Sequence, residues 1–424
     1  MRKINWIIAC CLFISVQLFG QQVKKSTFGD VLLKNATIVT VTNGTIEGDL
    51  LIKDGIISDI GSSLSANGAT EIDCSNKFIY PGFIDGGTQL GLVEISSVSL
   101  TRDSDELGDY TPHMQALTAV NPNAVAIPVT RVNGVTTVFS KPTGDLFPGT
   151  GAVIDLHGYT PDQMYAGSKA VLMNYPSTGK RGRWDRRKEE DIKKDNEKAM
   201  KKLKDFWSQA EIYAKINQTG GEYNPQLAAM VPVVKGESPL LIEVNKKADI
   251  LSALEWINKN EIKAVFTGVS EGWRVADSLV KYNIPVITGP VLRVPSRGSD
   301  RYDVSYTNPA KMLEAGVKVA IRSNETENVR NLPFNAGFAA AYGMGVEEAL
   351  KAITIIPAEI FGISDKYGSL EKGKVANLFV CDGDPFETKT QIQYLFIKGW
   401  NVPMESRHTL LYDEFLERDP GIKE

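Results

Sequence analysis

The sequence contains little histidine and little cysteine. Three histidines occur among 424 residues, and two of the four cysteines, Cys10 and Cys11, lie in the apolar N-terminal segment. Imidazole is the commonest protein ligand of transition metals and the commonest general acid or base, so its scarcity restricts both kinds of site. The chain also has no GxSxG motif, no glycine-rich phosphate loop and no plausible Cys/His pair, which leaves no replacement set of catalytic residues.

The sequence has no large excess of charge of either sign. The formal net charge is −4 and the isoelectric point is about 5.7. Such a balance gives no electrostatic reason to expect nucleic acid or an anionic membrane surface as partner. Hydrophobic residues make up 42% of the chain and charged residues 23%, values typical of a soluble α/β enzyme with a sizeable core.

Long apolar runs are absent beyond the N-terminus. Met1-Arg2-Lys3 is followed by an apolar stretch from Ile4 to Phe19 and then by polar residues. This pattern predicts a cleavable secretory signal over residues 1–20, because the run is shorter than the ~20 residues that a membrane span requires. We therefore expect an exported protein, periplasmic or secreted, with no membrane span in its mature form.

Strand-like and helix-like segments alternate along most of the chain. Residues 31–41, 49–61 and 71–82 are short strand-like segments separated by turns, and they predict a small antiparallel sheet. Between residue 83 and about residue 363, strand-length apolar runs such as GVTTVFS, PLLIEV, KAVFTGV and VKVAIRS alternate with helical segments such as ILSALEWINKN. This alternation predicts a parallel sheet closed by crossover helices. Strand character returns at 376–381 and 392–398, so both chain ends are expected to build the small sheet.

Residues 180–204 form a strongly charged segment of both signs at helical spacing. Because acidic residues interleave throughout, we favour a solvated helix with i,i+4 ion pairs over a nucleic-acid or partner patch. The apolar residues that follow are expected to dock this helix onto the main domain. They are Phe206, Trp207, Ala210 and Tyr213.

Residues 81–89, PGFIDGGTQ, carry the most specific motif of the chain. They resemble the amidohydrolase superfamily signature, in which PGFID leads into a His-x-His pair at the end of the first barrel strand. Similar segments follow in order at 133–138, 235–250, 279–290, 312–324 and 367–387. The sequence thus resembles imidazolonepropionase-like and dihydroorotase-like amidohydrolases over nearly all of the mature chain. The resemblance implies a (β/α)₈ TIM barrel over residues 81–365 and a small β-sandwich domain formed by both termini, residues 27–80 and 366–410.

The resemblance also implies a divalent metal such as Zn²⁺ at the barrel mouth, where it would activate water for attack on a carbon–nitrogen bond. The matching positions are Asp85, Gly87 and Gln89 on the first strand, Glu243 and Asn245 on the fifth, Thr267 or Gly268 on the sixth and Asn324 on the eighth. No imidazole stands at any of them, and the amide of Asn324 is no general base. We therefore predict a vestigial site, with no confident catalytic residue and no metal cofactor.

Few other residues offer a substitute. An oxygen-only site from Asp85, Gln89, Glu243 and Asn324 would suit Ca²⁺ or Mg²⁺, but it is short of charged ligands. We expect the three histidines, His113, His157 and His408, to be surface or core residues rather than ligands. Four arginines lie near the loops expected at the barrel mouth, where this fold often binds anions, although scattered surface arginines remain the favoured interpretation. They are Arg293, Arg297, Arg301 and Arg322.

Two functions follow from this pattern. The first is a non-catalytic binding or assembly subunit that forms a homo-oligomer or pairs with an active amidohydrolase paralogue, with a possible small-molecule ligand in the barrel mouth. The alternative is an active hydrolase of non-peptide or cyclic amide bonds. We favour the first, because all the metal-binding imidazoles are missing together.

Two structural expectations follow. In the barrel mouth the remaining polar groups must find partners, and we expect Arg322 to lie near Glu243 in part of the space of the metal. We also expect a residual pocket, open to solvent, between the strand-seven and strand-eight loops. Cys74 and Cys381 both belong to the expected small domain and could approach disulfide distance, but strands of one sheet need not be neighbours. Free thiols are therefore favoured over a disulfide.

Overall fold

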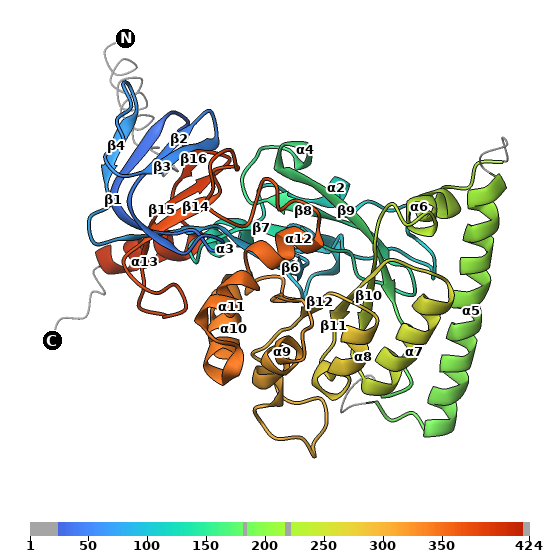
Figure 1. Cartoon of the computed structure of the whole chain (residues 1–424). Helices are drawn as coiled ribbons and strands as arrows, with labels where there is room; N and C mark the ends of the chain where they lie inside the picture. The colour runs from blue at the N-terminus through green and yellow to red at the C-terminus, as the bar shows by residue number, and fades with distance from the viewer. Residues whose placement is uncertain (1–23, 181–184, 217–221, 419–424) are drawn as a thin grey trace, which may run out of the picture.

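The computed structural model describes residues 24–180, 185–216 and 222–418 and consists of a barrel with a second sheet at one side (Figure 1). The predicted signal segment, residues 1–20, lies outside the described residues, as do Cys10 and Cys11. Within the described ranges, no helix is long and apolar enough to cross a membrane.

Both ends of the chain build the second sheet, as predicted. Its order is β16-β15-β14-β5-β1-β2-β3, with β4 paired to β1. The strands are β1 (Val31–Val39), β2 (Thr45–Lys53), β3 (Ile56–Gly61), β4 (Thr70–Asp73), β5 (Phe78–Pro81), β14 (Leu378–Cys381), β15 (Ile392–Ile397) and β16 (Trp400–Val402). The N-terminal part joins the C-terminal part through the antiparallel pair β5–β14.

The prediction of a purely antiparallel N-terminal sheet is wrong. Strands β4 and β5 both run parallel to β1, because the chain crosses back after β3 and starts again beside the beginning of β1. The predicted sandwich is one eight-stranded sheet folded over its own apolar core, which includes Ile38, Leu50, Val380 and Phe396. Cys74 and Cys381 are buried as free thiols, as favoured.

The barrel is formed by eight consecutive strands in the order β13 to β6. They are β6 (Phe83–Thr88), β7 (Val135–Ser140), β8 (Gly149–Asp155), β9 (Tyr165–Asn174), β10 (Leu240–Val244), β11 (Ala264–Gly268), β12 (Val286–Thr288) and β13 (Val319–Ile321). Backbone hydrogen bonds from Asn324 to Gly87 (3.1 Å) and from Gln89 to Glu325 (3.2 Å) join the two ends at the mouth.

The barrel departs from eight parallel strands at one place. Strand β8 runs antiparallel to both β7 and β9, whereas all other neighbours are parallel. The segments before and after β8 are too short for crossover helices, and only the four-residue α4 separates β8 from β9. The expected barrel is therefore confirmed as an architecture, with one reversed strand that the alternation pattern did not predict.

Helices cover the outside of the barrel and fill its connections (Figure 1). The α-helices are α2 (Ala116–Ala119), α3 (Ala126–Arg131), α4 (Pro161–Met164), α5 (Glu189–Ile216), α6 (Pro225–Val234), α7 (Lys247–Lys259), α8 (Ala276–Lys281), α9 (Val304–Glu314), α10 (Leu332–Ala339), α11 (Val346–Lys351), α12 (Ile355–Ile360) and α13 (Arg407–Glu417). Shorter 3₁₀ turns are η1 (Ser99–Thr101), η3 (Gly272–Arg274) and η4 (Val329–Asn331), and η5 (Ala340–Met344) is a π-helical turn.

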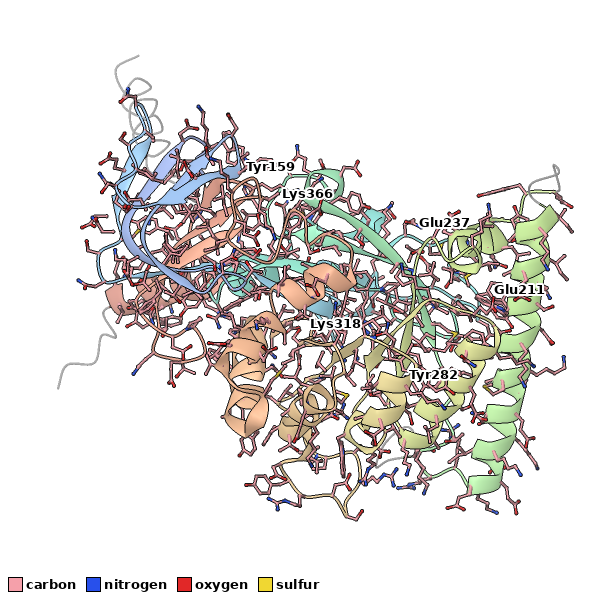
Figure 2. All side chains as sticks on the ribbon, viewed as in Figure 1. Tyr159, Glu211, Glu237, Tyr282, Lys318 and Lys366 are labelled. Atoms are coloured by element: carbon pink, nitrogen blue, oxygen red, sulfur yellow. The ribbon has the colours of Figure 1, made fainter. Side chains whose placement is uncertain are left out.

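The long charged helix is α5, and it begins later than predicted, at Glu189 rather than near residue 180. Its apolar residues 206, 207, 210 and 213 are all buried, which confirms the predicted docking face. Phe206 stacks on Tyr110 with ring centroids 4.3 Å apart, and Trp207 donates a hydrogen bond to Glu211 at 2.9 Å. Glu211 marks this helix in the side-chain view of the molecule (Figure 2).

Strand periodicity places polar side chains at the barrel mouth. Alternate residues on a strand point inward, and the interior apolar layer includes Phe139, Leu241, Val265 and Ala320. Two residues further toward the mouth on the same strands stand Lys141, Glu243, Thr267 and Arg322. An apolar layer therefore supports a polar layer at the carboxyl ends of the strands, the end where this fold places its sites.

Candidate functional site

The centre of the polar layer is an ion pair between Glu243 and Arg322. Two parallel hydrogen bonds join them, from Arg322 Nη1 to Glu243 Oε2 (2.7 Å) and from Nη2 to Oε1 (2.8 Å). The Arg322 side chain is 2% exposed and that of Glu243 is 24% exposed. This bidentate geometry is the strongest form of the arginine–carboxylate contact, and the structure has the expected partner in the expected place.

Three more side chains surround the Glu243 carboxylate. Thr267 Oγ1 donates to Oε2 at 2.8 Å, Asn245 Nδ2 donates to Oε1 at 3.2 Å, and Lys141 Nζ lies 3.7 Å from Oε2. Burial alone would raise the pKa of Glu243, but Arg322 and Lys141 outweigh it and hold that pKa well below its usual range. Glu243 is therefore a fixed anion whose two oxygens are both occupied.

Two glycines make room for this arrangement. A Cβ atom on Gly87 would lie 3.2 Å from Cδ of Arg322 and 3.5 Å from Cδ of Lys141. A Cβ on Gly268, which has φ +84°, would lie 2.5 Å from Oε1 of Glu243. Because these two positions have no side chain, Arg322, Lys141 and Glu243 can occupy the space beside them.

Asp85 lies below this cluster and is fully buried. Its carboxylate accepts hydrogen bonds from the backbone N–H of Gly87 (2.9 Å) and of Ser323 (3.1 Å and 3.2 Å). Burial raises the pKa of Asp85 to about 6 despite these donors. Asp85 therefore joins the first strand to the eighth, and its oxygens face backbone rather than a ligand.

Asn324 and Gln89 complete the predicted positions. Asn324 adopts a left-handed conformation with φ +53°, and its side-chain Oδ1 is buried without a hydrogen-bond partner in the described structure. Gln89 is connected to the eighth-strand loop through its backbone N–H, which donates to the carbonyl oxygen of Glu325. The predicted residues are thus brought to one end of the barrel, but only Glu243, Asn245 and Thr267 bond to one another through side chains.

Lys141 is the site residue that the sequence analysis missed. It stands directly after β7, and its side chain is 10% exposed. Burial, together with the charge of Arg322, lowers the pKa of Lys141 to about 8. Its position two residues beyond the inward-facing Phe139 was the available signal, because strand periodicity aims both into the barrel.

A cavity of about 1300 Å³ opens above the Glu243 carboxylate. Loops after β9, β10, β11 and β12 form its walls. A residual pocket thus opens beside the ion pair, but its expected place between the strand-seven and strand-eight loops is wrong, because backbone hydrogen bonds join the loop after β13 to the end of β6. The charged lining residues of the cavity are Lys180, Glu243, Lys246, Asp249, Glu271, Arg293, Arg297 and Asp300. The four arginines of the mouth loops, for which scattered surface positions were favoured, have different places. Arg293 and Arg297 line the cavity, Arg322 is buried in the ion pair at its base, and Arg301 pairs with Asp303 outside it.

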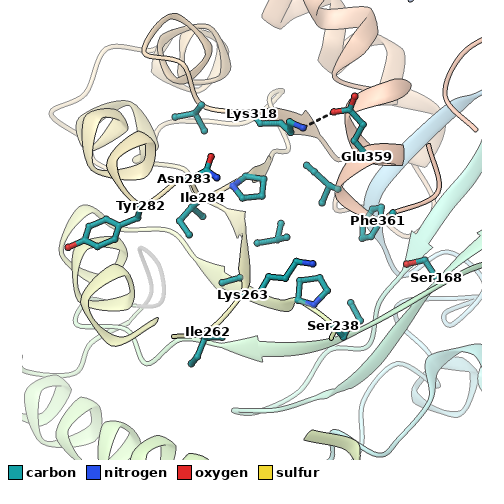
Figure 3. Close-up of a pocket in the computed structure, with 18 of the residues that line it drawn as sticks. Ser168, Ser238, Ile262, Lys263, Tyr282, Asn283, Ile284, Lys318, Glu359 and Phe361 are labelled. Carbon is teal, nitrogen blue, oxygen red and sulfur yellow. Dashed lines mark hydrogen bonds and ion pairs between the residues drawn. The ribbon is translucent and has the colours of Figure 1, made fainter. Parts of the chain in front are cut away.

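A second cavity, of about 720 Å³, lies at the opposite end of the barrel (Figure 3). The amino ends of β10 to β13 and the loops before them line it, including Lys263, Tyr282 and Lys318, whose Nζ is paired with Glu359 at 2.8 Å. In this fold the amino-terminal face serves stability and the carboxyl-terminal face carries the chemistry. The mouth cavity is therefore the candidate site.

The three histidines lie away from both the ion pair and the mouth cavity. His113 is in the loop before α2, and its Nδ1 is buried without a partner in the described structure. His157 packs against Trp400, with ring centroids 5.5 Å apart, and His408 is exposed on α13. Within the described ranges, no group of three or more His, Cys, Asp or Glu side chains is placed to hold a metal ion.

Comparison with known proteins agrees with this architecture. The model of the amidohydrolase family matches residues 296–402. The D-hydantoinase of Geobacillus stearothermophilus is 44% identical over 77 residues, 18% of this chain and 16% of that protein. The imidazolonepropionase of Thermoplasma volcanium is 33% identical over 120 residues, 26% of this chain and 28% of that protein. The chain thus matches less than a third of the length of these curated relatives.

Solved structures resemble the chain over most of its length, and one of them shares a quarter of its residues. The crystal structure of an amidohydrolase from Thermotoga maritima aligns with a TM-score of 0.78 at 25% sequence identity, and it covers 88% of this chain and 99% of that one. The order of the motifs, the barrel with its terminal sheet and the partial match to the family model point in the same direction. The chain is similar to the amidohydrolase family in part of its sequence and in its fold.

Proposed function

We propose that this protein is a non-catalytic member of this family, a binding or assembly subunit whose barrel mouth is held by an ion pair in place of a metal. The observation that carries the proposal is the bidentate bond between Arg322 and Glu243. The guanidinium neutralises the carboxylate at the position where the resemblance implies a metal ligand. The Arg322 side chain thus supplies the positive charge that a metal ion would supply in the related enzymes.

The residues present do not fit a transition metal. Both oxygens of Glu243 already accept hydrogen bonds, and the neighbouring Lys141 and Arg322 are positively charged groups that would repel a metal cation. Asp85, the other charged residue among the predicted positions, turns its oxygens to backbone N–H groups. The donor set that Zn²⁺ prefers, imidazole and thiolate with an open position for water, is not assembled here from the described residues.

The alternative is a hydrolase of carbon–nitrogen bonds, and the names of the similar proteins, D-hydantoinase and imidazolonepropionase, favour it. Such an enzyme needs a group that activates water. In this mouth Glu243 is held as an anion by two cations, and Asn324 offers an amide that does not accept a proton near neutral pH. The geometry therefore supports binding better than hydrolysis.

Elemental analysis with parallel activity assays tests the proposal. Purified protein should contain far less than one equivalent of Zn²⁺, Mn²⁺ or Fe, and should hydrolyse no hydantoin, lactam or dipeptide before or after incubation with these metals. A D-hydantoinase purified and assayed in the same way serves as control for metal retention and assay sensitivity. Stoichiometric metal, or turnover that is lost on Glu243→Gln, would overturn the proposal and make Glu243 a catalytic residue.

Export and assembly belong to the same proposal. The apolar N-terminal segment supports export to the periplasm or the exterior. Mass spectrometry of protein recovered from the producing cells should find the mature N-terminus close to residue 21, and a chain retained in the cytoplasm with residue 1 intact would contradict export. Light scattering of the same material determines whether copies of the chain associate; a monomer that also fails to bind an active paralogue would contradict the assembly role.

A further inference from the structure

The acidic side chains around the mouth cavity all have partners, whereas several of the basic ones form no ion pair among the described residues. Four acidic and four basic side chains line the cavity, and each acidic one has partners of its own. Glu243 is bound by Arg322, Glu271 by Arg297, and Asp300 by Arg274. Asp249 accepts hydrogen bonds from Ser177 Oγ at 2.8 Å and from the backbone N–H of Thr178 at 2.9 Å. The acidic residues of the lining are therefore already bound by partners within the protein.

Three lining cations lack such partners. Arg293, Lys246 and Lys180 form no ion pair within the described part of the chain, and the one hydrogen bond among their side chains runs from Lys246 Nζ to the backbone carbonyl of Lys180 at 2.9 Å. Arg293 is exposed at the cavity wall, and the protein around it, with the charge of Arg322, lowers its pKa. Arg322 and Arg274 balance Glu243 and Asp300, and Lys141, whose Nζ lies 3.7 Å from Glu243 Oε2, adds a further positive charge.

The unpaired cations stand on two sides of the cavity. Lys180 and Lys246 follow β9 and β10, whereas Arg293 follows β12, two strands further around the barrel. Between these two sides lie the end of β11 and the saturated Glu243 carboxylate. A ligand with negative charge at only one end would meet one side; a ligand with negative charge at both ends would meet both.

We propose that the mouth cavity binds a small organic molecule with two oxyanion groups, one held by Arg293 and the other by Lys246 with Lys180. A guanidinium binds carboxylate and phosphate through paired N–H donors, and a lysine ammonium binds either as a point charge. The cavity volume of about 1300 Å³ leaves room for a ligand of this size. Glu243 does not oppose its binding, because Arg322 and Lys141 cancel its charge. This assignment rests on the proposed non-catalytic function.

Calorimetric titration of the full chain with three probes tests the assignment. Glutarate carries two carboxylates, 3-phosphoglycerate carries one carboxylate and one phosphate, and glutaramide has the shape of glutarate without charge. At least one of the two anions should bind with a Kd below 1 mM, and glutaramide should bind at least tenfold more weakly than glutarate. The stronger of the two anions identifies the oxyanion that the site prefers.

Single substitutions connect binding to the named residues. Arg293→Gln and Lys246→Gln should each weaken the better anion by about tenfold, and raising the salt concentration should weaken it further. Arg301→Gln is the matched control, because Arg301 lies on the same loop but pairs with Asp303 outside the cavity, and it should leave Kd unchanged. The thermal melting temperature of each variant, close to that of the parent chain, shows that the protein remains folded.

Several outcomes overturn the assignment. They are an absence of binding by both anions, equal binding of glutaramide and glutarate, or unchanged binding in Arg293→Gln and Lys246→Gln. None of these affects the proposed non-catalytic function, which fails separately if a stoichiometric metal or hydrolysis is found. Mass spectrometry of the probe after incubation should find it unchanged. This measurement distinguishes binding of the probe from its hydrolysis.

Discussion

Two carboxylates in this molecule each have several side-chain partners, but the two groups differ in burial and in the charge of those partners. Glu243 lies at the barrel mouth and is bound by Arg322, with Lys141 nearby. Asp155 lies at the junction of the barrel with the terminal sheet and is completely buried. It accepts hydrogen bonds from Thr137 Oγ1 (2.8 Å), Asn377 Nδ2 (2.7 Å) and Tyr367 OH (3.0 Å), and Lys398 Nζ lies 3.2 Å away.

The difference between the two clusters lies in the balance of charge and the access of solvent. Neutral donors and one partly exposed lysine satisfy Asp155. They come from both the barrel and the terminal sheet, so the cluster links these two sheets. Two nearly buried cations surround Glu243, and a cavity opens beside it. A cluster with excess positive charge beside a cavity is suited to bind an anion. A cluster whose charges are balanced and that has no adjoining cavity stabilises the fold instead.

The largest effect is expected for Asp155→Ala. It leaves Tyr367, Asn377 and Lys398 without their common acceptor, and because the first two are buried the free energy of unfolding should fall by about 3–5 kcal/mol. Urea denaturation measures this. Asp59→Ala is the control, since Asp59 is exposed and paired with Lys372 at 3.6 Å, and it should change the free energy by less than about 0.5 kcal/mol. A similar small change for both variants would show that the junction cluster is no structural link.

A smaller loss is expected when the mouth ion pair is broken. Glu243→Leu leaves Arg322 and Lys141 as uncompensated cations, but the adjacent cavity lets water reach them, so the free energy of unfolding should fall by about 2–3 kcal/mol. The double variant Glu243→Leu with Arg322→Met removes the main unpaired charge and should recover at least about 1 kcal/mol. A strictly additive double variant would mean that the two side chains do not stabilise each other.

A still smaller loss is expected for Gly87→Ala. The added Cβ atom would approach Cδ of Arg322 to 3.2 Å, so the arginine must shift and its bidentate bond to Glu243 should weaken, at a cost of about 1–2 kcal/mol. Gly29→Ala is the control, because a Cβ there meets nothing within 4 Å. Equal stability of the two variants would show that the position of Arg322 does not depend on the absence of a side chain at Gly87.

The sequence predicted the fold better than the contents of the site. The PGFID motif and the alternating segments located β6, β7 and β10 to β13, because buried parallel strands form short apolar runs between helices. The antiparallel direction of β8 was not predicted; its connections to β7 and β9 lack the helix that a parallel crossover needs. Local patterns indicate that a strand exists, whereas its direction depends on its neighbours.

Within the site, the outcome differed from residue to residue. The position of Arg322 followed from the requirement that a buried carboxylate has a partner, and the ion pair was predicted for that reason. Lys141 was not predicted, because a lysine after a strand is usually solvated and only the alternation from Phe139 indicates that it points inward. The pairing of Glu271 with Arg297 joins two loops far apart in sequence, so no local pattern encodes it.

The smallest expected effect is the pH dependence that His157 gives the junction. This residue follows Asp155 by two positions and packs on Trp400 of the terminal sheet, whereas the mouth cluster has no histidine among its described residues. Burial, with the charges of Arg131 and Lys398, lowers the pKa of His157 to about 4, below the ordinary value near 6.5. Between these values the unfolded chain binds a proton that the folded protein does not bind.

Stability should therefore be complete above about pH 6.5 and should decrease as the pH falls toward about 4. His157 is partly exposed, so solvent reduces the expected contribution to about 1 kcal/mol. The substitution His157→Phe keeps a ring against Trp400 but removes the titrating group, and unfolding by urea at pH 5 and at pH 7 measures the difference. The parent chain should lose about 1 kcal/mol more than the variant between these two pH values. Identical losses would assign the acid sensitivity of the junction to its carboxylates instead, and Asp155 would then be the group to substitute next.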